Sequence, residues 1–100
     1  MPKVTLLMLK PSQMGNLYEH GMGFQLEVAR ADTCYYPVEI TGVSGELDGI
    51  PEEMFDLLNN PWRQAEREER YGRGRSLSIG DIVDVDGARQ LCCSFGWRSI

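Results

Sequence analysis

The stretch from Asp81 to Phe95 constrains the fold more than any other part of the sequence, because it has the pattern of a β-hairpin. Val83 and Val85 alternate with more polar neighbours, as on the inner face of a half-buried strand. Asp86 and Gly87 then supply a favoured two-residue hairpin turn. The return strand alternates as well, and its residues expected to point inward are Leu91, Cys93 and Phe95.

Three segments nearer the N-terminus also have strand patterns. The segment from Lys3 to Leu9 is apolar after its lysine, which predicts a buried central strand. Residues 24–30 alternate between apolar and other residues, which predicts a half-buried strand. Residues 35–43 predict a further strand with Val38 and Ile40 inward, and Pro37 indicates that it begins at an edge of the sheet.

Two short helices are expected between these strands and the hairpin. Pro51 suits a first helical position, and an apolar face formed by Met54, Leu57 and Leu58 follows at spacings of three and four. Asn59, Asn60 and Pro61 end that helix, and a second short helix is expected over residues 62–70. The fold class predicted is α+β: a mainly antiparallel sheet of about five strands, with one or two short helices and a C-terminal β-hairpin.

Length and composition favour one small domain, residues 1–100, with an ordinary soluble-globular composition of 42% hydrophobic and 25% charged residues. The longest apolar run falls short of a membrane span, and the N-terminal run is too short for the core of a secretory signal. We therefore expect a cytoplasmic protein with no membrane partner. Cys34, Cys92 and Cys93 are expected to be reduced, with Cys93 in the core and Cys92 on the opposite face.

Roughly residues 45–100 resemble the YodL-like domains, a family found in conjugative elements, plasmids and phages. The resemblance rests on a Ser-Leu-Ser-x-x-Asp turn and on a closing strand that ends in Ser-Phe-Gly. The matching residues are Ser76, Leu77, Ser78, Asp81, Ile82, Val83, Ser94, Phe95 and Gly96. Cys93 stands where the family has an aspartate, and the segment before Ser76 is longer and carries added arginines. The resemblance implies a mobile-element context rather than an activity.

The sequence offers little chemistry for catalysis, so we expect no enzyme, no cofactor and no metal. Ser78 and Asp81 have the spacing of a capping box, which favours a structural turn over a serine nucleophile. The only histidine, His20, has no orienting partner nearby. Asp81 points away from Asp84 and Asp86 on a strand, and too few Cys and His residues are present for zinc.

The Arg-rich segment, residues 62–75, is the first candidate binding site. Its candidate contact residues are Trp62, Arg63, Arg67, Arg70, Tyr71, Arg73 and Arg75. Five arginines against three glutamates leave a charge of only +2, so a solvated helix with internal ion pairs is one interpretation. Contact with a protein and contact with nucleic acid are the functional alternatives, since Arg, Trp and Tyr serve both.

The second candidate is acidic. Nine carboxylates lie between Glu19 and Asp56 against Arg30 alone, and the whole chain carries −5. The candidate acidic surface consists of Glu46, Asp48, Glu52, Glu53 and Asp56. Such a surface can present a phosphate-like field to a positively charged groove.

The function predicted is a non-enzymatic protein-binding module of a phage, plasmid or conjugative element. In one concrete form it inhibits a host defence system of the anti-CRISPR or anti-restriction type, and the partner is a nucleic-acid-binding defence complex. The alternative is a nucleic-acid-binding accessory protein that uses the Arg-rich segment. The chain's acidity makes that alternative the weaker one, because nucleic-acid binders present a strong basic field.

Overall fold

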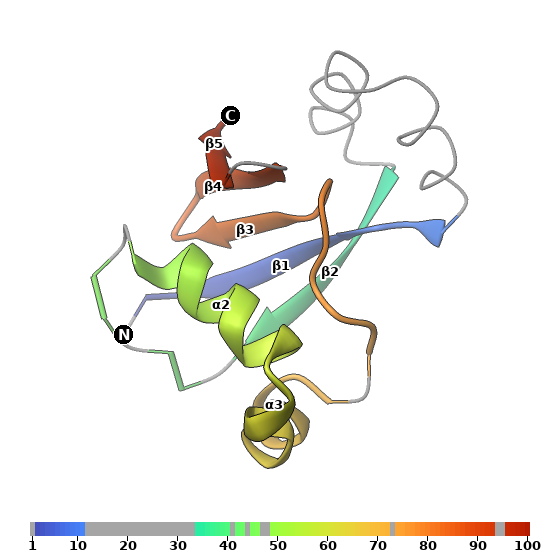
Figure 1. The fold of residues 1–100 in the computed structure, drawn as a ribbon. Helices are drawn as coiled ribbons and strands as arrows, with labels where there is room; N and C mark the ends of the chain where they lie inside the picture. The colour runs from blue at the N-terminus through green and yellow to red at the C-terminus, as the bar shows by residue number, and fades with distance from the viewer. Residues whose placement is uncertain are drawn as a thin grey trace.

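The computed structural model contains a five-stranded antiparallel sheet with two short helices, which confirms the α+β prediction (Figure 1). It describes residues 2–11, 34–40, 42–43, 45–46, 49–72, 74–93 and 96–100. The elements are β1 (Val4–Leu9), β2 (Tyr35–Ile40), α2 (Ile50–Asn59), the 3-10 turn η3 (Pro61–Arg63), α3 (Gln64–Arg70), β3 (Ile82–Val85), β4 (Ala88–Cys93) and β5 (Gly96–Ser99). The strand predicted over residues 24–30 lies outside the described residues.

The sheet order is β2-β1-β3-β4-β5, and β1 is an interior strand that pairs on both sides, in agreement with the buried strand predicted there. Leu6 of β1 lies opposite Val38 on one side and opposite Val83 on the other. All three side chains therefore share one face, because residues directly opposite in a sheet point the same way. The prediction that Val38 and Ile40 point inward is confirmed, and Pro37 lies in a strand at the edge of the sheet.

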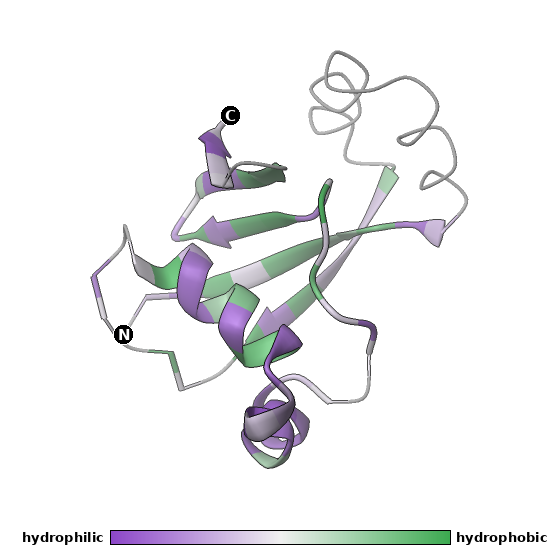
Figure 2. Cartoon of the chain, in the orientation of Figure 1, coloured by the Kyte–Doolittle hydropathy of each residue, from purple (hydrophilic) through white to green (hydrophobic). Residues whose placement is uncertain are grey.

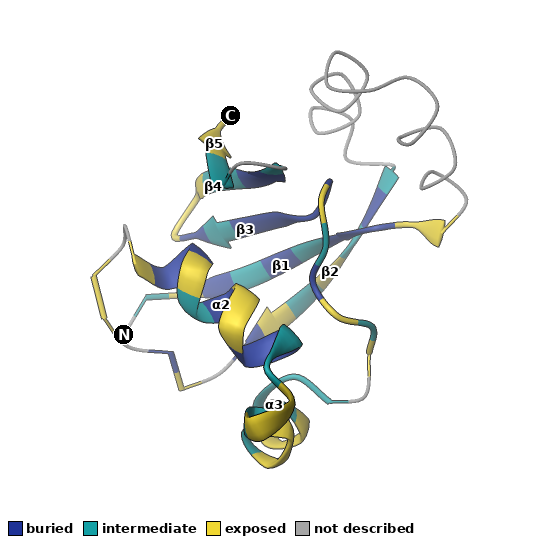
Figure 3. Ribbon diagram, in the orientation of Figure 1, coloured by how far each residue is buried: buried dark blue, intermediate teal, exposed yellow. Residues whose placement is uncertain are grey.

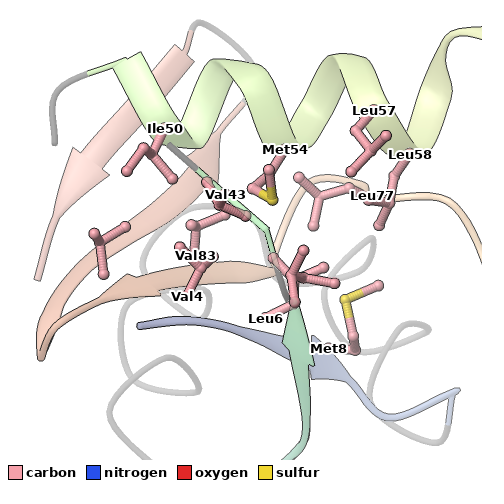
Figure 4. Close-up of a cluster of buried hydrophobic side chains, with 12 residues drawn as sticks. Val4, Leu6, Met8, Val43, Ile50, Met54, Leu57, Leu58, Leu77 and Val83 are labelled. Carbon is pink, nitrogen blue, oxygen red and sulfur yellow. The ribbon is translucent and has the colours of Figure 1, made fainter. Parts of the chain in front are cut away.

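Helix α2 covers one face of the sheet and buries its apolar side there (Figure 4). Met54, Leu57 and Leu58 have no exposed surface, as their spacing predicted. The polar side of α2 faces outward, so its ribbon alternates between hydrophobic and hydrophilic colours (Figure 2). The main apolar cluster between helix and sheet consists of Val4, Leu6, Met8, Ile40, Val43, Ile50, Met54, Leu57, Leu58, Leu77, Val83 and Val85.

The β3–β4 hairpin turns at Asp86 and Gly87 as predicted. Their φ angles of 51° and 94° are both positive, as the tightest hairpin turn requires. The prediction that Leu91 shares the inner face with Val83 is wrong, however. Val83 lies opposite Gln90, and Leu91 lies opposite Ile82 on the other face of the sheet.

Both faces of the hairpin are therefore buried. Leu9, Tyr35, Ile82 and Leu91 form a second apolar cluster on the face away from α2. Ile82 and Leu91 have no exposed surface at all. Alternation along these strands therefore distributes apolar residues between two cores rather than between a core and solvent.

Two helix boundaries differ from the prediction, and one strand was not predicted. Helix α2 begins at Ile50, so Pro51 is its second residue rather than its first. The single helix predicted over residues 62–70 is instead the turn η3 followed by α3, because the side chain of Asn60 caps the amide of Trp62. Strand β5 at the end of the chain was not predicted, and it pairs with β4. Within the described residues, no helix is long and apolar enough to cross a membrane.

Candidate functional site

A fully buried carboxylate, that of Asp81, organises the turn that precedes β3. The Asp81 amide donates to the Ser78 carbonyl at 3.1 Å, and its Oδ2 accepts a hydrogen bond from the Ser78 amide at 2.8 Å. Its Oδ1 accepts from the amide of Leu9, at the end of β1, at 2.7 Å. The structural reading of Ser78 and Asp81 therefore holds, although the turn leads into a strand rather than a helix.

Arg75 completes this site with a bidentate ion pair. Its Nη2 lies 2.6 Å from Oδ1 of Asp81, and its Nη1 lies 2.7 Å from Oδ2. Nη2 also donates to the carbonyl of Leu9 at 2.9 Å. The hydrogen bond to Asp81 raises the pKa of Arg75, so the side chain stays charged. Its guanidinium is used in contacts within the fold, to Asp81 and Leu9. Sequence reasoning missed the pair, and the only signal was an acid placed directly before a buried strand.

Two tyrosine hydroxyls donate to backbone carbonyls around the pair. Tyr35 bonds the carbonyl of Gly80 at 2.8 Å, and Tyr71 bonds the carbonyl of Arg75 at 2.7 Å. Burial raises the pKa of both tyrosines, so both stay protonated at neutral pH. Asp81 accepts four hydrogen bonds of 2.6 to 2.8 Å, whereas the Ser78 hydroxyl lies 3.4 Å from its Oδ2, so the strong partners of this carboxylate are Arg75 and two backbone amides.

Arg63 lies at the centre of an ion-pair network that joins η3 to both helices. Its guanidinium contacts Glu53 at 2.6 Å, Asp56 at 2.8 Å and Glu66 at 2.9 Å. Hydrogen bonds to Glu53 and Asp56 raise the pKa of Arg63, and the Arg63 hydrogen bond lowers the pKa of Asp56. Arg63 is thus surrounded by negative charge and offers little to a phosphate.

The other arginines of the Arg-rich segment also contact the chain itself. Arg70 lies 3.4 Å from Glu66, one helical turn earlier. Arg67 stacks over the ring of Tyr71 at 5.6 Å and donates to the carbonyl of Gly74. Arg73 lies outside the described residues. These contacts agree with the interpretation of a helix with internal ion pairs.

Trp62 is the member of the segment that faces solvent, with 94% of its surface exposed. The η3–α3 region around it is drawn mainly as exposed (Figure 3). Phe55, on the outer side of α2, is 39% exposed. The structure therefore divides the predicted set: Tyr71 and Arg75 belong to the buried turn, whereas Trp62 lies on the surface.

The charged residues of α2 are all acidic. Glu52 and Asp56 are exposed, Glu53 is half-buried, and α2 carries no basic residue. Residues 50–70 contain three arginines and six carboxylates, so the net charge of this region is −3. The carboxylates are Glu52, Glu53, Asp56, Glu66, Glu68 and Glu69. Glu46 is exposed, and Asp48 lies outside the described residues.

The cysteines have a different arrangement from the one predicted. Cys92 and Cys93 do point to opposite faces, but Cys92 is the buried one, on the side of α2, and Cys93 is only partly buried. The register explains this correction, since Cys92 lies opposite Trp97, which packs against the main apolar cluster. Burial raises the pKa of Cys92 to about 11. Among the residues described, no cluster of His, Cys, Asp and Glu is arranged to hold a metal ion.

The surface of the described residues includes two hollows near the helices. One of about 370 Å³ lies between α3 and the following loop and is lined by Gln64, Arg67, Glu68 and Gly72. These side chains combine no nucleophile with a base. The other, of about 170 Å³, lies between α2 and the end of the sheet and is lined by Glu52, Phe55, Cys92, Cys93, Gly96 and Trp97.

Comparisons of the chain with protein-family models, with curated proteins and with solved structures find no match.

Proposed function

We propose that this chain is a non-enzymatic protein-binding module whose contact surface is the outer side of α2 and η3. The α2–η3 surface comprises Glu52, Phe55, Asp56 and Trp62. The observation that carries the proposal is the exposure of two aromatic rings, Trp62 at 94% and Phe55 at 39%, on two consecutive elements of which α2 carries the exposed carboxylates Glu52 and Asp56. Exposed Trp residues are costly in water and are enriched among the anchors of protein interfaces.

The charge of this surface indicates the kind of partner. The region from Ile50 to Arg70 carries −3, and Arg63 is neutralised by Glu53, Asp56 and Glu66. A basic protein surface complements such a field, whereas a nucleic-acid backbone is repelled by it. The same field weakens the alternative of nucleic-acid binding through the Arg-rich segment.

In its concrete form, the partner is a nucleic-acid-binding complex of a host defence system, and the module belongs to a mobile genetic element. Two features support this form: the resemblance of residues 45–100 to YodL-like domains, and an acidic surface that can compete with nucleic acid for a basic groove. The module then acts by occupying the groove, with no covalent chemistry.

Affinity capture from a host lysate with the full chain as bait tests the proposal. Phe55→Ala and Trp62→Ala remove the two anchors, and Ile79→Ala is the matched control, because Ile79 is also 39% exposed but lies in the turn before β3. We expect a nuclease-resistant partner with the wild-type chain and with Ile79→Ala, and its loss with the other two variants.

Fluorescence anisotropy with labelled DNA and RNA at about 100 mM salt provides the opposing test. The proposal expects no sub-micromolar binding. Tight binding that weakens steeply with salt and that Arg67→Glu abolishes would instead support the nucleic-acid alternative. In the affinity capture, a protein that is lost when the lysate is treated with nuclease would also support the nucleic-acid alternative.

A further inference from the structure

Within the described residues, β5 pairs with β4 on one side and with no strand on the other. The Ile100 amide donates to the carbonyl of Arg89 on β4 at 3.2 Å, and Arg98 lies opposite Leu91. Antiparallel pairing alternates, so the N–H and C=O groups of Trp97 and Ser99 point away from β4. In the part of the chain that the structure describes, these outward groups have no hydrogen-bond partner.

The other edge of the sheet, β2, is protected against an added strand. The Lys10 amide donates to the carbonyl of Cys34, which fixes the same alternation there. Pro37 therefore falls at a position where an N–H would point outward, and proline has none. Proteins commonly block edges in this way. No proline occurs in β5, so it is the edge available for pairing.

The hollow of about 170 Å³ lies beside this edge, since Trp97 and Gly96 of β5 form part of its lining. Its other walls include the ring of Phe55 and the carboxylate of Glu52, which accepts the indole N–H of Trp97 at 2.8 Å. Small-molecule sites usually measure about 300 to 1,000 Å³, so this hollow suits one side chain rather than a cofactor.

We propose that an extended segment of a protein partner adds to β5 as a further strand and places one lysine or arginine side chain in this hollow. The side chain packs on Phe55 and Trp97 with its charge against Glu52. Main-chain hydrogen bonds to Trp97 and Ser99 supply affinity, and the hollow supplies specificity. The inference rests on the proposed function, because it specifies how the protein partner docks.

A second copy of the chain is a weaker occupant. Each copy carries −5, so two copies repel one another, whereas a basic segment is attracted. Charge complementarity therefore selects a basic peptide of a different protein.

The test is a selection of random dodecapeptides, displayed on phage, for binding to the full chain. The selected peptides are then labelled with fluorescein, and their binding is measured by fluorescence anisotropy. We expect winners with alternating β-branched residues around one lysine or arginine. Ser99→Pro removes an outward N–H and leaves the pairing with β4 in place, so it should weaken binding at least about tenfold. Ser99→Ala is the control. Like Ser99→Pro, it loses the hydrogen bond that the Gln90 side chain donates to the Ser99 hydroxyl, but it keeps the backbone N–H, so it should bind peptides as the wild type does.

Glu52→Gln tests the hollow separately. It should weaken peptides that carry the basic residue and should leave versions with norleucine at that position unchanged. Glu69→Gln is the matched control, because Glu69 is an exposed carboxylate of α3 that does not line the hollow. The melting temperature of each variant establishes that it is folded.

Three outcomes would overturn strand addition: no enriched peptide, equal binding by Ser99→Pro and Ser99→Ala, or a dimer in sedimentation that Ser99→Pro dissociates. Peptide binding that is lost in Trp62→Ala but unchanged in Ser99→Pro would overturn strand addition while supporting the α2–η3 surface. Loss of the captured host protein in Ser99→Pro but not in Trp62→Ala would support strand addition and reject Trp62 as an anchor of the α2–η3 surface.

Discussion

Arg75 and Asp81 form a bidentate ion pair in which both oxygens of a fully buried carboxylate are bound, at 2.6 and 2.7 Å. The same two side chains bond the amide and the carbonyl of Leu9. The pair thus ties the loop before β3 to the end of β1, a segment more than sixty residues earlier in the chain.

Removal of Asp81 should be severely destabilising. Asp81→Ala leaves the Arg75 guanidinium and the Leu9 amide without their partner, and breaking a buried pair costs about 3 to 5 kcal/mol. Urea unfolding measures this loss. Arg75→Met should cost a similar amount, and the double variant should lose less than the sum of the two single losses. Additive losses would show that the two side chains are not coupled.

A charge on either face of the hairpin should prevent folding. Val83 and Leu91 have no exposed surface and point to opposite faces. Val83→Asp and Leu91→Asp should each lower the free energy of unfolding by more than about 4 kcal/mol, because each buries an unpaired carboxylate. Ala88→Ser, on the exposed end of β4, is the control and should stay within about 0.5 kcal/mol. A mild effect at Leu91 alone would show that only the face under α2 is a core.

The Arg63 network should contribute modest stability that depends on pH and salt. Arg63→Gln should lower the free energy of unfolding at pH 7 by about 1 to 2 kcal/mol, the order of a few exposed ion pairs. Because the pKa of Asp56 lies below its ordinary value of 3.8 in the folded chain, its contribution is present above that pH and is lost at lower pH. The difference between Arg63→Gln and wild type should therefore shrink in acid and in high salt.

Arg98→Gln is the control for Arg63→Gln, since Arg98 is exposed on β5 and lies outside the network. It should change the unfolding midpoint little at any pH. An equal effect of the two variants would show that the network adds nothing beyond the loss of one positive charge.

The thiol of Cys92 should be unreactive in the native chain. Burial raises its pKa from 9.0 to about 11, and only 4% of the residue is exposed. Iodoacetamide at pH 8 should modify Cys92 in urea but not in buffer, as mass spectrometry of the peptides can show. Because the raised pKa favours the neutral thiol, its stabilisation is full below pH 9 and declines as the pH rises through about 11. Cys92→Ala should remove that alkaline decline, and equal modification in both solvents would contradict the buried position.

Several elements were predictable from local pattern. The apolar run of β1, the spacing of Met54, Leu57 and Leu58, and the turn at Asp86 and Gly87 each match what the structure contains. The erroneous face assignment of Leu91 was also avoidable. A two-residue turn pairs Val85 with Ala88, so Val83 must share a face with Gln90.

The candidate site was less accessible to prediction. The segment from Trp62 to Arg75 was identified as a unit by composition, yet its members have different roles. Trp62 faces solvent, Arg63 binds carboxylates from two helices, and Arg75 binds a buried acid. Only packing decides which of several arginines meets a given carboxylate, because all of them have the same intrinsic chemistry.

The sequence by itself determined several local elements of this protein: the strands β1 and β2, the apolar side of α2, and the tight turn between β3 and β4. Those features depend on neighbours a few residues apart, through backbone sterics and the periods of helix and strand. The tertiary structure decided that β1 lies between β2 and β3, that Arg75 reaches both Asp81 and Leu9, and that β5 forms one edge of the described sheet. These depend on which distant surfaces can be buried together with every buried polar group paired, a condition on the whole chain.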